Sequence, residues 1–212
     1  MNAKQASPKI IIEKLVKSFD ENQVLKDINL QVEAGQSLCI IGTSGCGKSV
    51  TLKCLLGLIS PTSGSIKVDG IEMVGQSRAQ REDTLKKFGM TFQFGALFDS
   101  LPIWQNIMFR PLQQGVVSGK NAREEATHIA TQLGLRAEVI DQFPAELSGG
   151  MQKRVALARA IADKPEILLF DEPTSGLDPI TGGVIDNLIL DAVKRLGATA
   201  MTISHDLSLI HI

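Results

Sequence analysis

Residues 42–49 carry the clearest chemistry in this sequence. They read Gly-Thr-Ser-Gly-Cys-Gly-Lys-Ser and fit the phosphate-loop template G-x-x-x-x-G-K-[ST] at every fixed position. The glycines let the backbone wrap around an anion, and a helix that starts here points its positive end at that anion. Lys48 supplies a cation for the outer phosphates, and the Ser49 hydroxyl can ligate Mg²⁺. A plain glycine-rich turn is the alternative, which the apolar strand before the loop and the helical pattern after it disfavour. We therefore expect a nucleoside triphosphate to be bound by Gly42, Thr43, Ser44, Gly45, Cys46, Gly47, Lys48 and Ser49.

Two adjacent carboxylates follow an apolar stretch farther along the chain. Residues 166–170 read as a buried strand, and Asp171 and Glu172 stand at its carboxyl end. Asp171 at such a strand end suits a Mg²⁺ site beside a phosphate loop. Glu172 can polarise an attacking water as a general base. Adjacent acids are also common in solvated turns, so this pair gains its meaning from the phosphate loop upstream.

A second helix start is also suited to an anion. Ser148, Gly149 and Gly150 precede a strong helical pattern over residues 151–162. A hydroxyl and two glycine amides at a helix N-terminus can cradle a phosphate, although an ordinary helix cap is the alternative. The chain therefore has two helix N-termini that could each bind a phosphate, and one function should account for both.

The elements that would position these residues alternate between strand and helix. Strands are predicted at residues 10–17, 24–33, 37–41, 65–69, 89–93, 166–170 and 199–204. Helices are predicted at residues 49–58, 78–87, 103–109, 122–133, 151–162 and 179–196. This order predicts an α/β fold of the P-loop NTPase type. Its mainly parallel sheet core would carry an N-terminal antiparallel β region and an inserted helical subdomain.

Residues 94–143 form the predicted insertion, between the two parts of the ATP-binding core at residues 1–93 and 144–212. Aromatic side chains crowd the approach to this insertion, namely Phe88, Phe92, Phe94, Phe98, Trp104 and Phe109. We expect most of them to fill the core of the small subdomain. A small helical insertion cannot easily bury them all, so part of the cluster is expected to form an exposed apolar dock.

The composition is that of an ordinary globular protein, with 43% hydrophobic and 21% charged residues. A net charge of −1 argues against a dedicated nucleic-acid binder. Two adjacent basic pairs, Lys86 with Lys87 and Lys153 with Arg154, are expected to lie on solvated helix faces. No signal-peptide core is visible, and no apolar run nears the ~18 residues that span a membrane. We therefore expect a soluble, cytoplasmic chain.

The cysteines at positions 39, 46 and 54 lack a metal-binding spacing, which indicates free thiols in a reducing compartment. Cys46 lies inside the phosphate loop, near Lys48 and a helix N-terminus. We therefore expect a reactive thiol when the loop holds no nucleotide. An inert small residue in a variable slot is the alternative.

Taken together, these motifs resemble those of ATP-binding-cassette (ABC) ATPases. The resemblance runs from about Ile10 to the end of the chain. In the order of that family come the phosphate loop, Gln93, Leu-Ser-Gly-Gly-Met at 147–151, the strand ending in Asp171 and Glu172, Ser-Gly-Leu-Asp at 175–178 and Ser-His-Asp at 204–206.

The resemblance implies a role for each matching residue. Phe19 would stack on adenine, and Asp178 would lie at a dimer interface. Gln93 would sense Mg²⁺ and water, and with Glu172 and His205 it would make up the catalytic set. His205 would contact the γ-phosphate as a switch. Mg²⁺ would be bound by Ser49, Gln93 and Asp171, and ATP by the phosphate loop together with Ser148, Gly149 and Gly150 of a second subunit.

In this family two cassettes close head to tail over two ATPs, which would explain two anion cradles on one chain. The resemblance therefore implies a homodimer that hydrolyses ATP at the cytoplasmic face of the inner membrane, as a peripheral subunit. It would drive a separate integral-membrane permease and have no nucleic-acid partner. Residues 93–98, Met151 and residues 178–181 look most like the ATPases of lipid-trafficking Mla/Mce systems. That likeness implies phospholipid cargo and lipid-binding envelope partners.

Other classes remain as alternatives. Other ABC importers and lipoprotein exporters share most of these motifs. Soluble ABC ATPases that remodel ribosomes or DNA usually carry two cassettes or long coiled-coil insertions, and a non-hydrolysing regulatory module would not need Glu172 and His205. Cassettes of this family usually continue past the switch histidine with another helix and further strands. This sequence stops at Ile212, so we expect the end of the core sheet to be missing.

Overall fold

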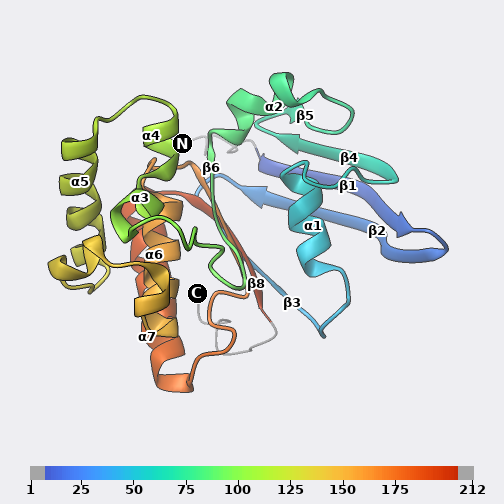
Figure 1. The fold of residues 1–212 in the computed structure, drawn as a ribbon. Helices are drawn as coiled ribbons and strands as arrows, with labels where there is room; N and C mark the ends of the chain where they lie inside the picture. Colours follow the sequence, from blue (N-terminus) through green and yellow to red (C-terminus); the bar gives the residue numbers. More distant parts are fainter. Residues whose placement is uncertain (1–7, 205–212) are drawn as a thin grey trace, which may run out of the picture.

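Two four-stranded sheets form the framework of the molecule, whose computed structural model describes residues 8–204 (Figure 1). One sheet is antiparallel, with the order β2-β1-β4-β5, and the other is parallel, with the order β3-β8-β7-β6. The strands are β1 (Pro8–Phe19), β2 (Asn22–Glu33), β3 (Ser37–Ile41), β4 (Ser63–Val68), β5 (Ile71–Glu72), β6 (Phe88–Thr91), β7 (Ile167–Asp171) and β8 (Thr199–Ser204). The predicted α/β class with an N-terminal antiparallel region is confirmed.

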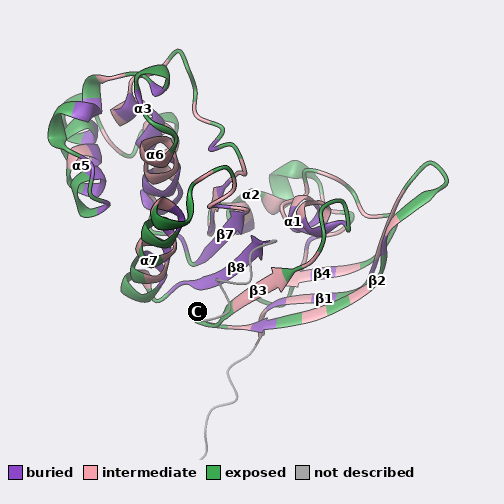
Figure 2. Cartoon of the chain, turned by 90° about the horizontal axis from the view of Figure 1, so that it is seen from below, coloured by how far each residue is buried: buried purple, intermediate pink, exposed green. Residues whose placement is uncertain are grey.

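The helices lie on both sides of the parallel sheet. They are α1 (Lys48–Leu55), α2 (Arg78–Leu85), α3 (Ile103–Ile107), α4 (Phe109–Gln113), α5 (Gly119–Gln132), α6 (Gly149–Ile161) and α7 (Pro179–Leu196), with short 3-10 helices η1 (Ala137–Asp141) and η2 (Pro144–Glu146). Figures 1 and 2 both show α1 on one side of this sheet and α6 with α7 on the other. None of the helices within residues 8–204 is long and apolar enough to cross a membrane.

The hydrophobic core divides at the parallel sheet, and β7 shows why. All five residues of β7 are buried, as Figure 2 makes visible at the centre of the molecule. Ile167 and Leu169 pack into a cluster with α1 and the antiparallel sheet. Leu168 and Phe170 pack into the other cluster, with α3, α5, α6 and α7. Because successive side chains of a strand point to opposite faces, a strand covered on both faces must be apolar throughout.

The structure corrects several predicted element boundaries. The first predicted helix extends to residue 58, but α1 ends at Leu55 because Gly57 adopts a left-handed φ of 66°. The helix predicted at 103–109 is two short helices, which meet at Met108 with a φ of −92° and a ψ of 18°. The short strand β5 was not predicted. The helix predicted to begin at Met151 begins at Gly149, so both glycines belong to its first turn.

The segment predicted as a separate helical subdomain contains α3, α4, α5 and η1. Its apolar residues share one continuous cluster with α6 and α7 of the core. The division into residues 1–93 with 144–212 and residues 94–143 therefore stays a prediction.

The aromatic side chains do not fill this segment in the way we expected. Trp104 packs against the cluster that contains α3 and α5, whereas Phe88 is buried in the other cluster. Phe94 is 86% exposed and Phe98 is 41% exposed. Phe98 stacks on Phe109, with ring centroids 4.4 Å apart. Of the six aromatic residues, Phe88 alone is buried, Phe92, Trp104 and Phe109 are half-buried, and Phe94 and Phe98 are exposed.

Candidate nucleotide-binding site

The phosphate loop connects β3 to α1 and opens into a pocket of about 190 Å³. The pocket is lined by Val24, Ser44, Gly45, Gly47, Lys48, Ser49, Val50, Gln93 and Glu172. These residues come from β2, the loop, α1 and the segments after β6 and β7. The fold therefore brings together the loop, the glutamine and one of the carboxylates that the sequence analysis selected separately.

Gly47 shows why the loop needs glycine. Its φ is 96°, which side-chain-bearing residues rarely adopt. A Cβ atom there would lie 2.7 Å from Leu25 Cδ2 and 3.1 Å from the Val24 carbonyl oxygen. The loop is thus pressed against β2. Val24 also lines the pocket. We had not selected it, because the pattern of a strand does not show which of its residues will face a distant loop.

Lys48 is buried against its own loop. Its ammonium group donates to the Gly42 carbonyl at 2.6 Å and to the Thr43 carbonyl at 2.9 Å. The Cys46 sulfur lies 3.9 Å from the same nitrogen, and Cys46 is exposed. Lys48 also lines the pocket, so its charge is held at the place where phosphate oxygens would enter.

Ser49 and Asp171 meet at the edge of the pocket. The Ser49 hydroxyl donates to Asp171 Oδ1 at 2.8 Å, and the Asp171 residue is only 6% exposed. Asp171 ends β7, whose neighbour β8 pairs with β3, so the parallel sheet carries the carboxylate to the phosphate loop. A hydroxyl and a carboxylate are hard oxygen ligands, and Mg²⁺ is usually bound by one or two protein ligands together with phosphate oxygens and water. This donor pair therefore fits Mg²⁺ bound beside a phosphate chain.

Gln93 and Glu172 form the second polar pair of the pocket. The Gln93 amide donates to Glu172 Oε2 at 3.1 Å. Glu172 has a φ of 46°, and its backbone N–H donates to the Ile203 carbonyl at 2.9 Å. A left-handed glutamate costs on the order of 1 kcal/mol and persists only where its surroundings hold it. The glutamate is therefore directed into the pocket by the end of the parallel sheet and met there by an amide.

The second anion cradle lies apart from this pocket. Ser148 caps α6 by accepting a hydrogen bond from the Met151 N–H at 3.4 Å, and Gly149 and Gly150 form the first turn. None of these three residues lines the pocket around the phosphate loop, and α6 lies across the parallel sheet from α1 (Figure 1). The chain thus has two separate helix N-termini of the kind that can hold an anion.

Asp178 caps the neighbouring helix α7. Its Oδ1 accepts hydrogen bonds from the Ile180 and Thr181 N–H groups at 3.1 and 3.0 Å. Hydrogen bonds from Thr181 hold the pKa of the Asp178 carboxyl below its ordinary value. A Cβ on Gly150 would lie 2.8 Å from Thr181 Cγ2, so the starts of α6 and α7 are in close contact.

Phe19, which was selected from the sequence, is not brought into the pocket. Phe19 stands at the turn between β1 and β2, is 42% exposed, and does not line the pocket; the Lys17 ammonium lies 4.8 Å from its ring centroid. His205 lies outside the described residues.

Lys153 and Arg154 do not lie on a solvated helix face, contrary to expectation. The Lys153 ammonium donates to the Gln93 carbonyl, and the Arg154 guanidinium donates to the Gly134 carbonyl at 2.9 Å. Desolvation lowers the pKa of Lys153, and the charges of Glu172 and Asp171 counteract this. In the other pair, Lys86 is exposed to solvent, as we expected, and forms an ion pair with Asp83.

An apolar groove of about 530 Å³ is lined by the segment after α1, by β6 and the segment after it, and by parts of α4 and α6. Its lining includes Leu58, Phe88, Met90, Phe92, Phe98 and Phe109, together with Arg110 and Arg159. Leu58 is 62% exposed. The buried Asn106 supports the segment by accepting from the Phe98 N–H at 2.7 Å and donating to the Leu101 carbonyl at 2.9 Å. We had not selected this asparagine, because its partners are loop backbone atoms that no residue pattern marks.

The fold and the pocket together define a phosphate-loop nucleotide-binding domain. A family model described as "ABC transporter" matches residues 25–175. The chain is 37% identical over 201 residues to the probable ribonucleotide transport ATP-binding protein mkl of Mycobacterium leprae, a match that covers 94% of this chain and 57% of that protein. It is also 37% identical to the L-cystine import ATP-binding protein TcyC of Bacillus subtilis, over 93% of this chain and 81% of that one.

Among solved structures, the chain is similar to a dimeric ATP-binding cassette in a post-hydrolysis state with ADP and Pi. The TM-score is 0.86 at 30% identity, over 94% of this chain and 89% of that one. This chain therefore belongs to the ABC transporter family and is one of its ATPase domains. It spans little more than half the length of the mycobacterial relative.

Proposed function

We propose that this chain is the ATP-hydrolysing subunit of an ABC transporter. The observation that carries the proposal is the meeting of two polar pairs beside the phosphate loop, one inside its pocket and the other at the pocket's edge. The hydroxyl of Ser49 lies 2.8 Å from Asp171, and the amide of Gln93 lies 3.1 Å from Glu172. One pair suits a metal ion on the phosphates, and the other suits an attacking water.

In this proposal the residues of the chain divide the work between binding and chemistry. The phosphate loop and Lys48 hold the β- and γ-phosphates, and Ser49 and Asp171, with Gln93, hold Mg²⁺, which when bound neutralises the charge that develops on the phosphates. Glu172 accepts a proton from the water that attacks the γ-phosphate, and Gln93 orients that carboxylate and the water. Phe19, which is exposed at the end of β1, is proposed to stack on adenine. His205 is proposed to contact the γ-phosphate.

Phosphate release from ATP tests this proposal directly. Glu172→Gln removes the general base but keeps the phosphate-binding groups, so kcat should fall by about 100-fold or more while ATP binding persists. Lys48→Ala should instead weaken ATP binding. Glu138→Gln, on an exposed carboxylate of η1, is the matched control and should hydrolyse ATP like the wild type. Equal turnover by the wild type and Glu172→Gln would contradict the assignment.

We further propose that two copies of the chain act together. The cradle at Ser148, Gly149 and Gly150 lies apart from the phosphate loop of its own chain, which supports its use on the γ-phosphate held by a second copy. The pocket of a single chain has a volume of about 190 Å³, which is below the ~300 Å³ typical of pockets for drug-sized ligands. This small volume fits a half-site that a second copy completes. Asp178, in contact with this cradle through α7, is proposed to lie at the interface of the two copies.

The proposed partner is an integral-membrane permease, with the chain bound to the cytoplasmic face of the membrane as a peripheral subunit. Relatives named for ribonucleotide transport and for cystine import support an importer of small polar solutes. Phospholipid transport with lipid-binding envelope partners is the second candidate, and it rests on the residues at 93–98, Met151 and 178–181.

Capture of the tagged chain from native membranes separates these cargoes. Mass spectrometry that finds a multi-span permease with enriched phospholipid and a lipid-binding envelope protein would support lipid transport. A permease accompanied by a solute-binding protein would support an importer. Ribosomal proteins or nucleic acid in place of a permease would contradict both and favour a soluble remodelling ATPase.

A further inference from the structure

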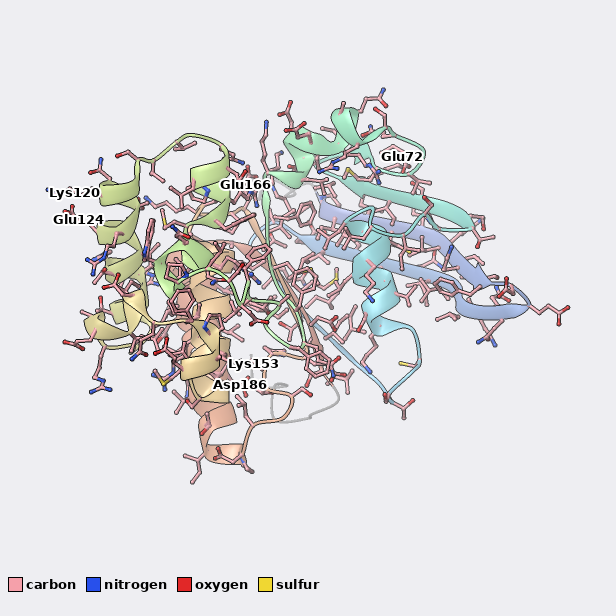
Figure 3. The ribbon with its side chains drawn as sticks, viewed as in Figure 1. Glu72, Lys120, Glu124, Lys153, Glu166 and Asp186 are labelled. Carbon is pink, nitrogen blue, oxygen red and sulfur yellow. The ribbon has the colours of Figure 1, made fainter. Side chains whose placement is uncertain are left out.

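Two basic side chains of helix α6 donate hydrogen bonds to the loop that follows β6. The ammonium group of Lys153, labelled in Figure 3, donates to the carbonyl of Gln93. The guanidinium of Arg159 donates to the carbonyls of Gly95 and Ala96, at 2.6 and 2.7 Å. Three carbonyls within residues 93–96 thus accept hydrogen bonds from one helix.

The conformation of this loop is disfavoured for one of its residues, Ala96. Gly95 has a φ of 73° and Ala96 a φ of 48°, so two successive residues are left-handed. This conformation is disfavoured for alanine, because its Cβ comes too close to the following carbonyl oxygen. The loop therefore needs contacts from outside to keep its shape, and the hydrogen bonds from α6 provide them.

Lys153 and Arg159 are less hydrated than ordinary surface cations, and this desolvation is unfavourable for their charged forms. Desolvation lowers the pKa of both Arg159 and Lys153, which means that their surroundings disfavour the charged forms. Carbonyl oxygens offset this desolvation because hydrogen bonds to charged donors are stronger than neutral ones. Arg159 also lies 6.0 Å from the ring centroid of Phe98, at the far end of the loop.

The helix that carries them is itself fixed against β6. A Cβ on Gly89 would lie 2.0 Å from the Ala160 carbonyl oxygen, so the backbones of β6 and α6 touch. Gln93 starts the loop, and its amide donates to Glu172. The place of that amide in the pocket therefore depends on a backbone that α6 holds.

We propose that Lys153 and Arg159 are positioning residues that clamp residues 93–96 to α6 and thereby keep the Gln93 amide on Glu172. The inference rests on the proposed ATPase function and deepens it, because it assigns the orientation of Gln93 to two residues that do not line the nucleotide pocket. The clamp also ties the loop to the helix that Ser148 caps, so the two anion cradles of a chain are connected through α6.

Amide hydrogen exchange and turnover, measured on the full chain, test the clamp. In Lys153→Met and Arg159→Met, exchange in the peptide covering residues 93–98 should be about tenfold faster, because the hydrogen bond from the Gly95 N–H to the Phe92 carbonyl opens with the loop. The kcat for ATP should fall about tenfold, as expected for a misplaced catalytic group, whereas ATP affinity should stay within about twofold.

A double-mutant comparison identifies the route of the effect. If the clamp acts through Gln93, then Gln93→Ala combined with Arg159→Met should turn over no more slowly than Gln93→Ala alone. Lys153→Arg keeps a cationic donor and should recover most of the loss. Arg154→Met is the matched control: it removes a guanidinium on α6 that donates to carbonyls of residues 133 and 134, and it should leave exchange in 93–98 unchanged.

The inference and the proposed function fail in different ways. Wild-type exchange at 93–98 in both clamp variants, or losses that multiply with Gln93→Ala, would overturn the clamp while ATP hydrolysis stands. A wild-type chain that releases no phosphate would overturn the proposed function, and the exchange measurement would still report whether Lys153 and Arg159 hold the loop.

Discussion

Cys46 differs from the other cysteines at the residue scale. It is exposed, within the phosphate loop, with its sulfur 3.9 Å from the Lys48 ammonium. Burial raises the pKa of the Cys39 and Cys54 thiols, which keeps them protonated and slow to react. The three thiols thus form an internal comparison, in which one lies where phosphates would bind and two do not.

Alkylation at pH 7.5 or so should therefore modify Cys46 first and abolish nucleotide binding, because the adduct fills the loop. Bound ATP should protect the thiol. Peptide mass spectrometry with and without ATP measures both effects, and Cys46→Ser should make binding resistant to the reagent. Equal labelling of Cys46 in the presence and absence of ATP would contradict the prediction.

At the scale of elements, ion pairs join the antiparallel sheet to the parallel one. Lys9 of β1 pairs with Asp69 at 2.8 Å and with Glu166, labelled in Figure 3 just before β7. Asp69 also pairs with Lys87, just before β6. Burial disfavours the charge on Asp69, but hydrogen bonds from Lys87 and Lys9 outweigh it and hold the pKa of that carboxyl below its ordinary 3.8.

A depressed carboxyl pKa stabilises the fold above the unfolded pKa, and the contribution is lost as the pH falls through the folded value. Asp69→Asn should therefore lower the free energy of unfolding by about 0.5–1 kcal/mol at pH 7, since the group is partly exposed. The difference should persist to about pH 4 and shrink below 3.8. Urea titrations of both proteins between pH 7 and 3 measure it; a pH-independent difference would show that charge is not the cause.

The elements also show how far the sequence could lead. The phosphate loop and the strand before Asp171 were predictable because their residue types and periodicity are local properties. The break at Met108 and the early end of α1 were not, because apolar periodicity marks the face of a helix and not its end. Lys153 and Arg159 were missed because their partners are carbonyls, which every residue carries.

At the scale of the whole molecule, the apolar groove is the surface best suited to the proposed permease. Its exposed apolar lining, including Leu58 and Phe98, is of a kind that an isolated domain rarely leaves open. We propose that a cytoplasmic helix of the permease fills it. The dock that we expected from aromatic crowding stays a prediction: Phe98 lines the groove, whereas Trp104 packs against the core.

Leu58→Asp should reduce permease capture from native membranes by about tenfold or more, because a charge would be desolvated in the complex. Val116→Asp is the matched control, since Val116 is apolar and 72% exposed but does not line the groove. Thermal melting of each variant confirms that it is folded. Normal capture by Leu58→Asp would place the permease on another surface.

The position of β8 has a consequence for how the chain is made. β8 is the last of the described strands in sequence, yet it lies between β3 and β7. During synthesis β3 and β7 leave the ribosome before β8, the strand that separates them. Until β8 is made, the edges of β3 and β7 that will pair with it expose unpaired backbone groups. Such exposed edges favour aggregation and engage chaperones. We therefore expect the nucleotide pocket, at whose edge Asp171 meets the phosphate loop across β8, to form only after β8 has been synthesised.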